Sequence, residues 1–100
     1  MSETISKEII VTHRPERNRF EAELDDGLAV LVYMKVGNTL IFHHTEVPEA
    51  LEGQGIAGSL AKAGLEYVKK NGISASALCP FVKAYVKRHT EYETLLSLKA

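Results

Sequence analysis

The sequence predicts a single mixed α/β (α+β) domain that spans residues 1–100. Three observations predict it. The first half alternates short apolar segments with tight turns, which is typical of antiparallel strands. From residue 56 the apolar residues recur at helical spacing. A short apolar segment and a second helical pattern then follow, so one more strand lies between two helices.

Four segments in the first half have strand character, and they cover residues 8–13, 19–24, 28–36 and 39–46. The second is the clearest, because Phe20, Ala22 and Leu24 alternate with charged residues, as in a half-buried strand. Asp25-Asp26-Gly27 and Gly37-Asn38 are typical hairpin turns. The short turns favour an antiparallel meander.

In the second half of the sequence, the apolar residues change from alternate positions to helical spacing. Small and apolar residues fall at positions 57, 60, 61, 64, 65 and 68, and Asn71-Gly72 then ends the predicted helix. Residues 73–78 form the predicted fifth strand. Pro80 suits the first position of a second helix, whose stripe comprises Phe81, Val82, Tyr85, Val86 and His89. We expect Leu95, Leu96 and Leu98 to pack down or to form a short last strand.

Strand four, the first helix and strand five form one crossover unit. Such units are almost always right-handed, with parallel strands. The carboxyl ends of strands four and five therefore share one edge of the sheet, and both helices begin there. Ligands bind at that edge in open α/β sheets, so we expect the functional site there.

Composition excludes several classes of function. The net charge is −1 and the charged fraction is 25%, so nothing favours nucleic acid or an acidic membrane surface as a partner. The apolar runs are too short to span a bilayer, and MSETISKEII lacks the features of a signal peptide. The single cysteine, Cys79, favours a reducing compartment, so we expect a cytoplasmic protein. The histidines show no metal-ligand spacing, and we predict no metal.

The glycine-rich segment between strand four and the first helix has the composition of a phosphate-binding loop. Gly53-x-Gly55-x-x-Gly58 matches the dinucleotide-binding motif, but six residues separate it from the strand and no acidic residue ends the next strand. The same glycines have P-loop spacing, but Ser59 replaces the essential lysine. A third possibility needs no lysine, because consecutive main-chain amides at a helix N-terminus bind anions. The structural alternative is a glycine turn with close helix–sheet packing.

This third possibility resembles the pyrophosphate loop of the GNAT-type N-acetyltransferases, with Glu52-Gly53-Gln54-Gly55-Ile56-Ala57 in place of their (Gln/Arg)-x-x-Gly-x-(Gly/Ala). Glu52 departs from that pattern, and we expect it to point away from the phosphates. "HTEVPEALEGQGIAGSLA" with "LCPFVKAYVKRHTEY" looks like the minimal GNAT-related enzymes, which lack the longer N-terminal helices. The resemblance covers residues 18 to 96. It implies a compact GNAT-like fold in which strand five splays from strand four.

The resemblance also implies acetyl-CoA as the cofactor. Its pantetheine arm would bond to the main chain around Thr45, Glu46 and Val47, and its diphosphate would meet the amides of the helix start. The predicted cofactor-binding set beyond strand four is Gln54, Gly55, Ile56, Ala57, Gly58, Ser59 and Cys79. One of the cations Lys83, Lys87 and Arg88 would reach the 3′-phosphate of the cofactor. The alternative is that all three lie on a solvated face of the helix.

Four residues are candidates for catalysis. Cys79 stands at the start of a helix, where a thiol pKa falls, so it is a nucleophile, a residue that lines the site, or an inert buried cysteine. His44 and Glu46 share one face of strand four, and either is a candidate base. His43 lies on the other face. The resemblance makes Tyr85 the candidate acid for the departing thiolate, the alternative being a core tyrosine.

We therefore predict an acetyl-CoA-binding N-acetyltransferase that acts on an amine, with acetyl-Cys79 as a candidate intermediate. The alternatives are a non-catalytic acyl-CoA-binding or regulatory module and a small protein-interaction domain. The sequence does not identify the acceptor, which is a small molecule, a peptide or a protein. We expect a monomer or a weak homodimer.

Overall fold

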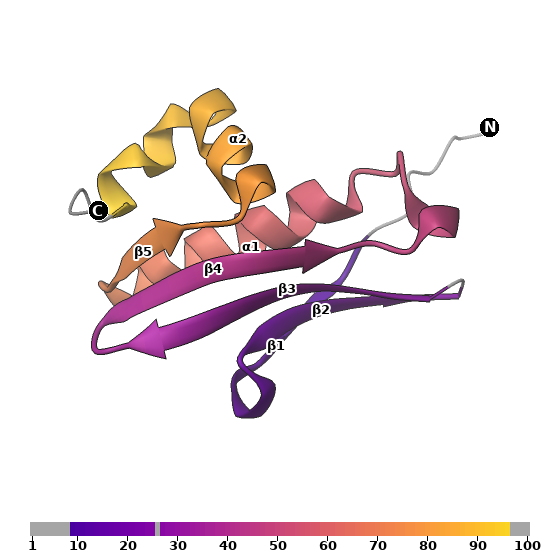
Figure 1. Ribbon diagram of the computed structural model, residues 1–100, viewed down its shortest axis with the longest axis horizontal. Helices are drawn as coiled ribbons and strands as arrows, with labels where there is room; N and C mark the ends of the chain where they lie inside the picture. Colours follow the sequence, from indigo (N-terminus) through magenta and orange to yellow (C-terminus); the bar gives the residue numbers. More distant parts are fainter. Residues whose placement is uncertain (1–8, 26, 97–100) are drawn as a thin grey trace.

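The computed structural model describes residues 9–25 and 27–96. Five strands form one sheet in the order β1-β2-β3-β4-β5, as the sequence predicts (Figure 1). The first four are antiparallel neighbours, and β5 pairs in parallel with β4. The strands are β1 (Val11–Arg14), β2 (Arg19–Leu24), β3 (Gly27–Val36), β4 (Thr39–Glu46) and β5 (Ser74–Ala77).

Three predicted strands differ in extent from those observed, and the smallest difference is in β3, which begins at Gly27 rather than at residue 28. The strand predicted over residues 8–13 begins at Val11 and continues to Arg14, while residue 8 lies outside the described part of the chain. The turn at residues 15–18 sets the β1–β2 register, in which Val11 opposes Ala22, and Ile10 remains exposed. The fifth strand is shorter than residues 73–78, because its chain leaves β4 after Ala77.

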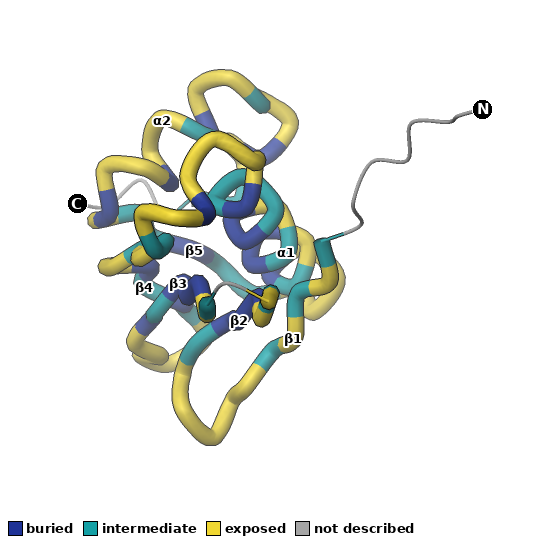
Figure 2. The backbone as a smooth tube through the Cα atoms, turned by 90° about the vertical axis from the view of Figure 1, so that its right-hand side faces the viewer, coloured by how far each residue is buried: buried dark blue, intermediate teal, exposed yellow. Residues whose placement is uncertain are grey.

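Both α-helices lie on one side of the sheet (Figure 2). They are α1 (Ile56–Asn71) and α2 (Pro80–Arg88). Helix α1 crosses the sheet and contacts all five strands, whereas α2 contacts β5 and α1. The opposite side of the sheet carries none of the described helices, and we call it the outer face. No described helix has the length and apolarity needed to cross a membrane.

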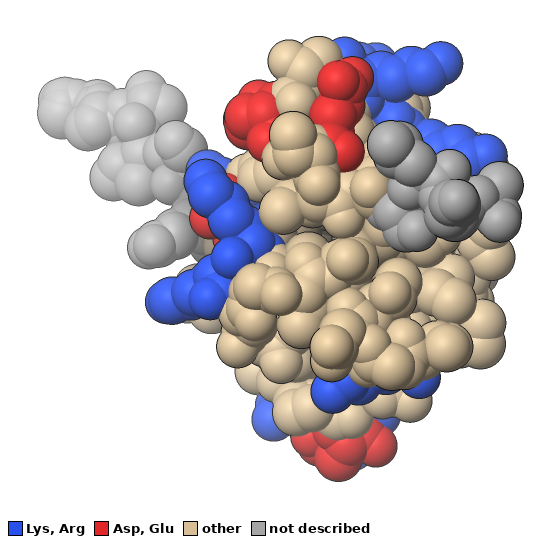
Figure 3. Space-filling view, turned by 90° about the vertical axis from the view of Figure 1, so that its left-hand side faces the viewer, with Lys and Arg blue, Asp and Glu red and all other residues tan. Residues whose placement is uncertain are grey.

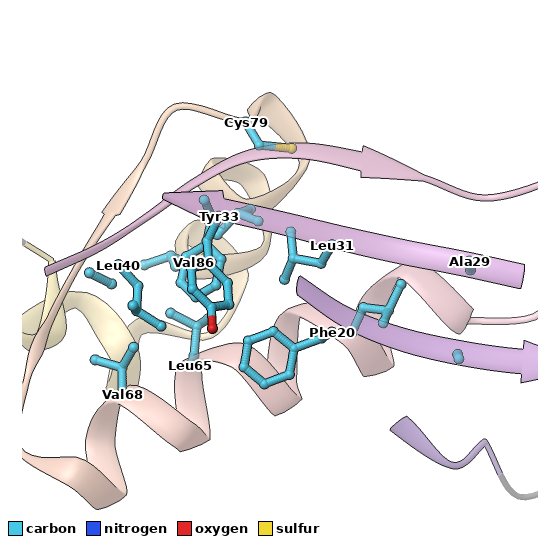
Figure 4. Close-up of a cluster of buried hydrophobic side chains, with 14 of the residues drawn as sticks. Phe20, Ala29, Leu31, Tyr33, Leu40, Leu65, Val68, Cys79 and Val86 are labelled. Atoms are coloured by element: carbon cyan, nitrogen blue, oxygen red, sulfur yellow. The ribbon is translucent and has the colours of Figure 1, made fainter. Parts of the chain in front are cut away.

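The core fills the space between the sheet and the helices. Aromatic and aliphatic side chains from β2, β3, β4 and α1 meet there, and Figure 4 shows Phe20, Leu31, Tyr33, Leu40, Leu65 and Val68 among them. Val82 and Val86 join from α2, as the apolar stripe predicts. Phe81 belongs to the same predicted stripe but is exposed, so this part of the stripe faces outward rather than into the core.

The C-terminal segment packs down as a 3-10 helix, Thr90–Leu95, rather than as a full strand. Its buried Tyr92 donates a hydrogen bond of 2.6 Å to the Glu66 carboxylate of α1. Leu96 forms a single parallel bridge with Ala75 of β5, and Leu98 lies outside the described residues. The segment thereby ties α1 and β5 together at one end of the sheet.

His13 is enclosed by aromatic rings on the core side of β1. It stacks on Phe20 at 4.2 Å between ring centroids, meets Tyr67 edge-on at 4.4 Å, and its Nε2 lies 2.7 Å from the Tyr33 hydroxyl. Burial lowers the pKa of the imidazole below its ordinary 6.5, against an opposing effect of Glu16. The folded protein therefore favours neutral His13.

This pKa predicts a loss of stability in mild acid. The unfolded chain binds a proton at His13 more readily than the folded chain, so the free energy of unfolding falls as the pH drops below about 6.5. We expect the urea midpoint to be lower at about pH 5.5 than at about pH 7.5, with a smaller difference in His13→Gln. An equal difference in the variant would assign the effect to other groups.

Candidate functional site

Strand β4 continues past the point where β5 leaves it. Pairing between the two strands covers only Thr39–Phe42, and the amides of Leu78 and Cys79 both donate to the Phe42 carbonyl, at 2.9 and 3.0 Å. Beyond the unpaired His43, residues 44–46 pair with β3 on one side and with no described strand on the other (Figure 1). This open edge is the splay that the sequence resemblance implied.

A β-bulge at His43 decides which side chains face this edge. The register changes between Val32 and Tyr33, which oppose His44 and Phe42, so His43 has no partner. A bulge places one extra residue in the strand and reverses the alternation beyond it. Thr45 consequently opposes Leu31 on the core side, while His44 and Glu46 lie together on the outer face.

The bulge brings Thr45 to Cys79. The Thr45 Oγ1 and the Cys79 Sγ lie 3.1 Å apart, and either atom can donate the hydrogen. Cys79 is the N-cap residue of α2, and only 4% of its surface is exposed. The only sulfhydryl of the chain is therefore held at the point where β4 and β5 separate.

His44 and Glu46 form the second group of predicted residues. The His44 Nε2 lies 3.5 Å from the Glu46 Oε1, and both side chains are more than half exposed. They share a face, as their spacing predicts. They point away from Thr45, so the strand itself lies between this pair and the Cys79 sulfur.

The glycine-rich loop enters α1 without a capping side chain. Gly55 is the N-cap residue in the left-handed conformation, with φ of 76°, which strongly favours glycine. The Ser59 amide donates to the Gly55 carbonyl at 3.1 Å and begins the helical ladder. The amides of Ile56, Ala57 and Gly58 therefore precede the first helical bond, and they point toward the loop side of the helix.

A cavity of about 370 Å³ lies at this helix start. One wall comes from the chain between β4 and α1, and the other comes from α2. Its lining residues are Val47, Leu51, Glu52, Gly53, Gly55, Ile56, Ala57, Gly58, Phe81, Tyr85, Arg88 and His89. Glu52 belongs to this lining.

Tyr85 is the central side chain of the α2 wall. Its ring stacks on His89 at 4.0 Å and lies 6.5 Å from Phe81, and a Cβ at Gly58 would come within 3.8 Å of it. Burial raises the pKa of the Tyr85 hydroxyl, and the carboxylates of Glu91 and Glu66 raise it further. The phenol therefore keeps its proton at neutral pH.

The structure thus places the predicted residues in three groups. Gly55, Ile56, Ala57, Gly58, Val47 and Tyr85 line the cavity; Thr45 and Cys79 contact each other; His44 and Glu46 lie on the outer face. Gln54 and Ser59 lie outside the cavity lining, and Ser59 lines a separate depression with Lys62 and Glu66. Within residues 9–25 and 27–96, no three side chains gather as potential metal ligands.

The cavity also contains residues that the sequence did not single out for binding. Leu51, Phe81 and His89 belong to its lining. Helical spacing carried a signal for Phe81 and His89, because they recur with Tyr85 at i, i+4 and i+8 on one face of α2. Arg88 is the only one of the three candidate cations in this cavity, since Lys83 and Lys87 line the opposite flank of α2.

Comparisons with known proteins agree with this arrangement. A family model described as GCN5-related N-acetyl-transferase matches residues 19–95. Protein NATD1 of Xenopus tropicalis is 39% identical over 87 residues, which cover 84% of this chain and 80% of the relative. Protein NATD1 of Homo sapiens is 39% identical over 84 residues, which cover 81% and 74%.

A solved structure shares the fold. The NMR solution structure of a GCN5-like protein from Staphylococcus aureus superposes with a TM-score of 0.69 at 27% sequence identity. The match covers 89% of this chain and 88% of the other. The similarity therefore includes the sheet, α1 and α2, and with them the elements that form the cavity.

Proposed function

Since the chain belongs to the GCN5-related N-acetyltransferase family, we propose that it binds acetyl-CoA and transfers the acetyl group to an amine. One observation carries the proposal. The cavity at the uncapped helix N-terminus is lined by Val47, the residue that follows β4, so an extended ligand held there can continue along the open edge of β4. Acetyl-CoA has the matching chemistry, with an anionic diphosphate at one end of an extended thioester arm.

The helix start would hold the diphosphate. The amides of Ile56, Ala57 and Gly58 supply hydrogen-bond donors, and the positive end of the helix dipole favours an anion there. Arg88 is the cation of this cavity and is the candidate partner for the 3′-phosphate. Glu52 lines the same cavity and opposes anion binding, so the amides and Arg88 must outweigh one carboxylate.

The thioester would reach the pair formed by Thr45 and Cys79. Val47 lines the cavity and lies two residues beyond Thr45, so the β4 edge leads from the cavity toward the sulfur. In the proposed first step the Cys79 thiolate attacks the acetyl carbonyl. The new bond joins Cys79 sulfur to the acetyl carbon, the thioester bond to CoA breaks, and CoA leaves as a thiolate.

Each of the two steps also requires a proton transfer. Tyr85 retains a phenolic proton and is the candidate donor to the departing CoA thiolate. In the second step an amine attacks acetyl-Cys79, the acetyl–sulfur bond breaks, and the amine loses a proton. His44 and Glu46 are the candidates to accept it, from the outer face of the open β4 edge that carries Thr45 on its core side.

Gly58→Val tests whether the helix start holds the ligand. The added side chain points toward Tyr85 across the cavity, so we expect acetyl-CoA to bind about tenfold more weakly or worse, equivalent to roughly 1.4 kcal/mol. Isothermal titration calorimetry measures this. Ala84→Val, on an exposed position of α2 outside this cavity, is the control and should bind normally.

Two results would reject the proposal. Equal affinities in Gly58→Val and wild type would place the ligand elsewhere. Saturable acetyl-CoA binding with neither acetylation of the protein nor CoA release in the presence of amines would favour the non-catalytic binding module.

A further inference from the structure

The outer face carries a row of functional side chains that the reaction at Cys79 does not explain. Cross-strand pairing aligns Arg14, Arg19, Val32 and His44 on four successive strands. The next row consists of Thr12, Glu21, Val30 and Glu46. Directly opposed residues share a face of the sheet, so arginines on β1 and β2 face the same side as the His44–Glu46 pair.

Three arginines surround one buried carboxylate on this face. Glu21 accepts hydrogen bonds from Arg19 at 2.6 Å, Arg14 at 3.3 Å and Arg17 at 3.5 Å. The hydrogen bond from Arg19 is the main reason why the pKa of Glu21 is lowered, so the carboxylate is ionised at neutral pH. One negative charge thus meets three positive charges.

The arginine cluster, comprising Arg14, Arg17 and Arg19, remains accessible. The Arg14 and Arg17 side chains are 47% and 59% exposed. Arg14 and Arg19 contact Glu21 through Nε, which leaves their terminal nitrogens available to a second carboxylate. Glu16 and Glu23 are also exposed nearby, on the adjoining turn and farther along β2. The excess positive charge is therefore local to the cluster.

An apolar floor separates the arginine cluster from His44 and Glu46. Val30 is only 7% exposed although it lies outside the core cluster, and Val32 is half-buried. The floor continues along β3 through exposed Met34 and Val36. Figure 3 views the end of the molecule that carries the β3–β4 turn, where side chains without charge cover a broad area. A polypeptide lying across the strands would cover this floor.

We propose that the outer face binds the acetyl acceptor, and that the acceptor is an acidic polypeptide segment that presents a lysine. This inference rests on the proposed function. The lysine stem would run past His44 and Glu46 at the open edge of β4, and a carboxylate of the same segment would bind the arginine cluster. Lysine is favoured over an α-amine because its long stem can pass the open edge of β4 to reach Cys79.

The geometry also sets the spacing within the acceptor. Neighbouring strands lie about 5 Å apart, so β1, which carries Arg14, is about 15 Å from β4. An extended peptide covers that distance in about four residues. We therefore expect the preferred acidic residue to stand about four positions from the acetylated lysine.

Matched peptides test this inference. One peptide carries glutamate about four positions from its single lysine, and the other carries glutamine there. With wild type we expect the KM for the glutamate peptide to be roughly two- to tenfold lower, because exposed ion pairs are worth at most about 1 kcal/mol each. Arg14→Gln with Arg17→Gln should abolish this preference, and it leaves the Arg19–Glu21 contact in place.

The control variant removes two positive charges from a different surface of the protein. Lys62→Gln with Lys69→Gln alters two exposed positions of α1, on the other side of the sheet, and should keep the preference. A preference that survives in the arginine variant, or is absent in wild type that forms acetyl-Cys79, would overturn the inference and leave the proposed function intact. Absence of both acetyl-Cys79 and amine acetylation would instead reject the proposed function.

Discussion

Cys79→Ala should abolish acetylation of the protein and slow transfer to amines by about 100-fold or more, while acetyl-CoA affinity stays close to that of wild type. Loss of a positioned nucleophile or proton-transfer group typically costs two to four orders of magnitude. Binding should survive because Cys79 does not line the cavity at the helix start. Intact-protein mass spectrometry after mixing with acetyl-CoA detects the acetyl group, and release of free CoA measures turnover.

Thr45→Val tests the neighbour of Cys79 in the same assays. It keeps the shape of the side chain and removes the hydroxyl that lies 3.1 Å from the sulfur. We expect slower acetylation of Cys79, since the hydroxyl no longer holds the sulfur in position. Wild-type turnover in Cys79→Ala would show that the amine attacks acetyl-CoA directly and would reduce Cys79 to a residue beside the site.

Gly64→Val should destabilise the protein by about 3 kcal/mol or more, because overpacking a well-filled core is costly. Gly64 is buried in the middle of α1, against β3 and β4. A Cβ there would come within 2.9 and 3.0 Å of the Phe42 ring and 3.3 Å of Leu31. Helix and sheet would have to separate to admit it. Urea denaturation followed by circular dichroism measures the loss.

The same substitution at Gly58 provides the comparison. Gly58 lies two turns earlier in α1, where a Cβ meets only Tyr85 at 3.8 Å and the cavity offers room. Gly58→Val should therefore change the free energy of unfolding by about 1 kcal/mol or less, while it weakens ligand binding. Similar losses of stability in the two variants would mean that helix propensity, rather than contact with Phe42, explains the result.

Most of the fold could be predicted because its signals are local. Alternation of Phe20, Ala22 and Leu24, the turn at Gly37-Asn38 and the helical spacing from residue 56 each act within one element. The predicted helices and the strand order agree with the structure. Among the strands, the ends of β1 and β5 and the start of β3 were misplaced, because strand ends depend on a partner strand that lies elsewhere in the sequence.

The candidate site could be predicted only as a set of residues. Composition, spacing and resemblance singled out the glycine-rich loop, Cys79, His44, Glu46 and Tyr85. A period of two continued from Phe42 would place His44 on the core side, whereas the bulge at His43 sends Thr45 there instead. Such a bulge depends on pairing between strands, so β4 alone carries no signal for it.

The sequence by itself determined the elements, their order and the residue types available for chemistry, since propensity and hydrophobic period act over a few neighbouring residues. Tertiary structure alone decided which of those residues meet. It paired Thr45 with Cys79, gave Arg88 rather than Lys87 to the cavity, and aligned the arginine cluster with His44 across the outer face. The physical reason is that strand register, helix packing and burial depend on contacts between residues far apart in the chain.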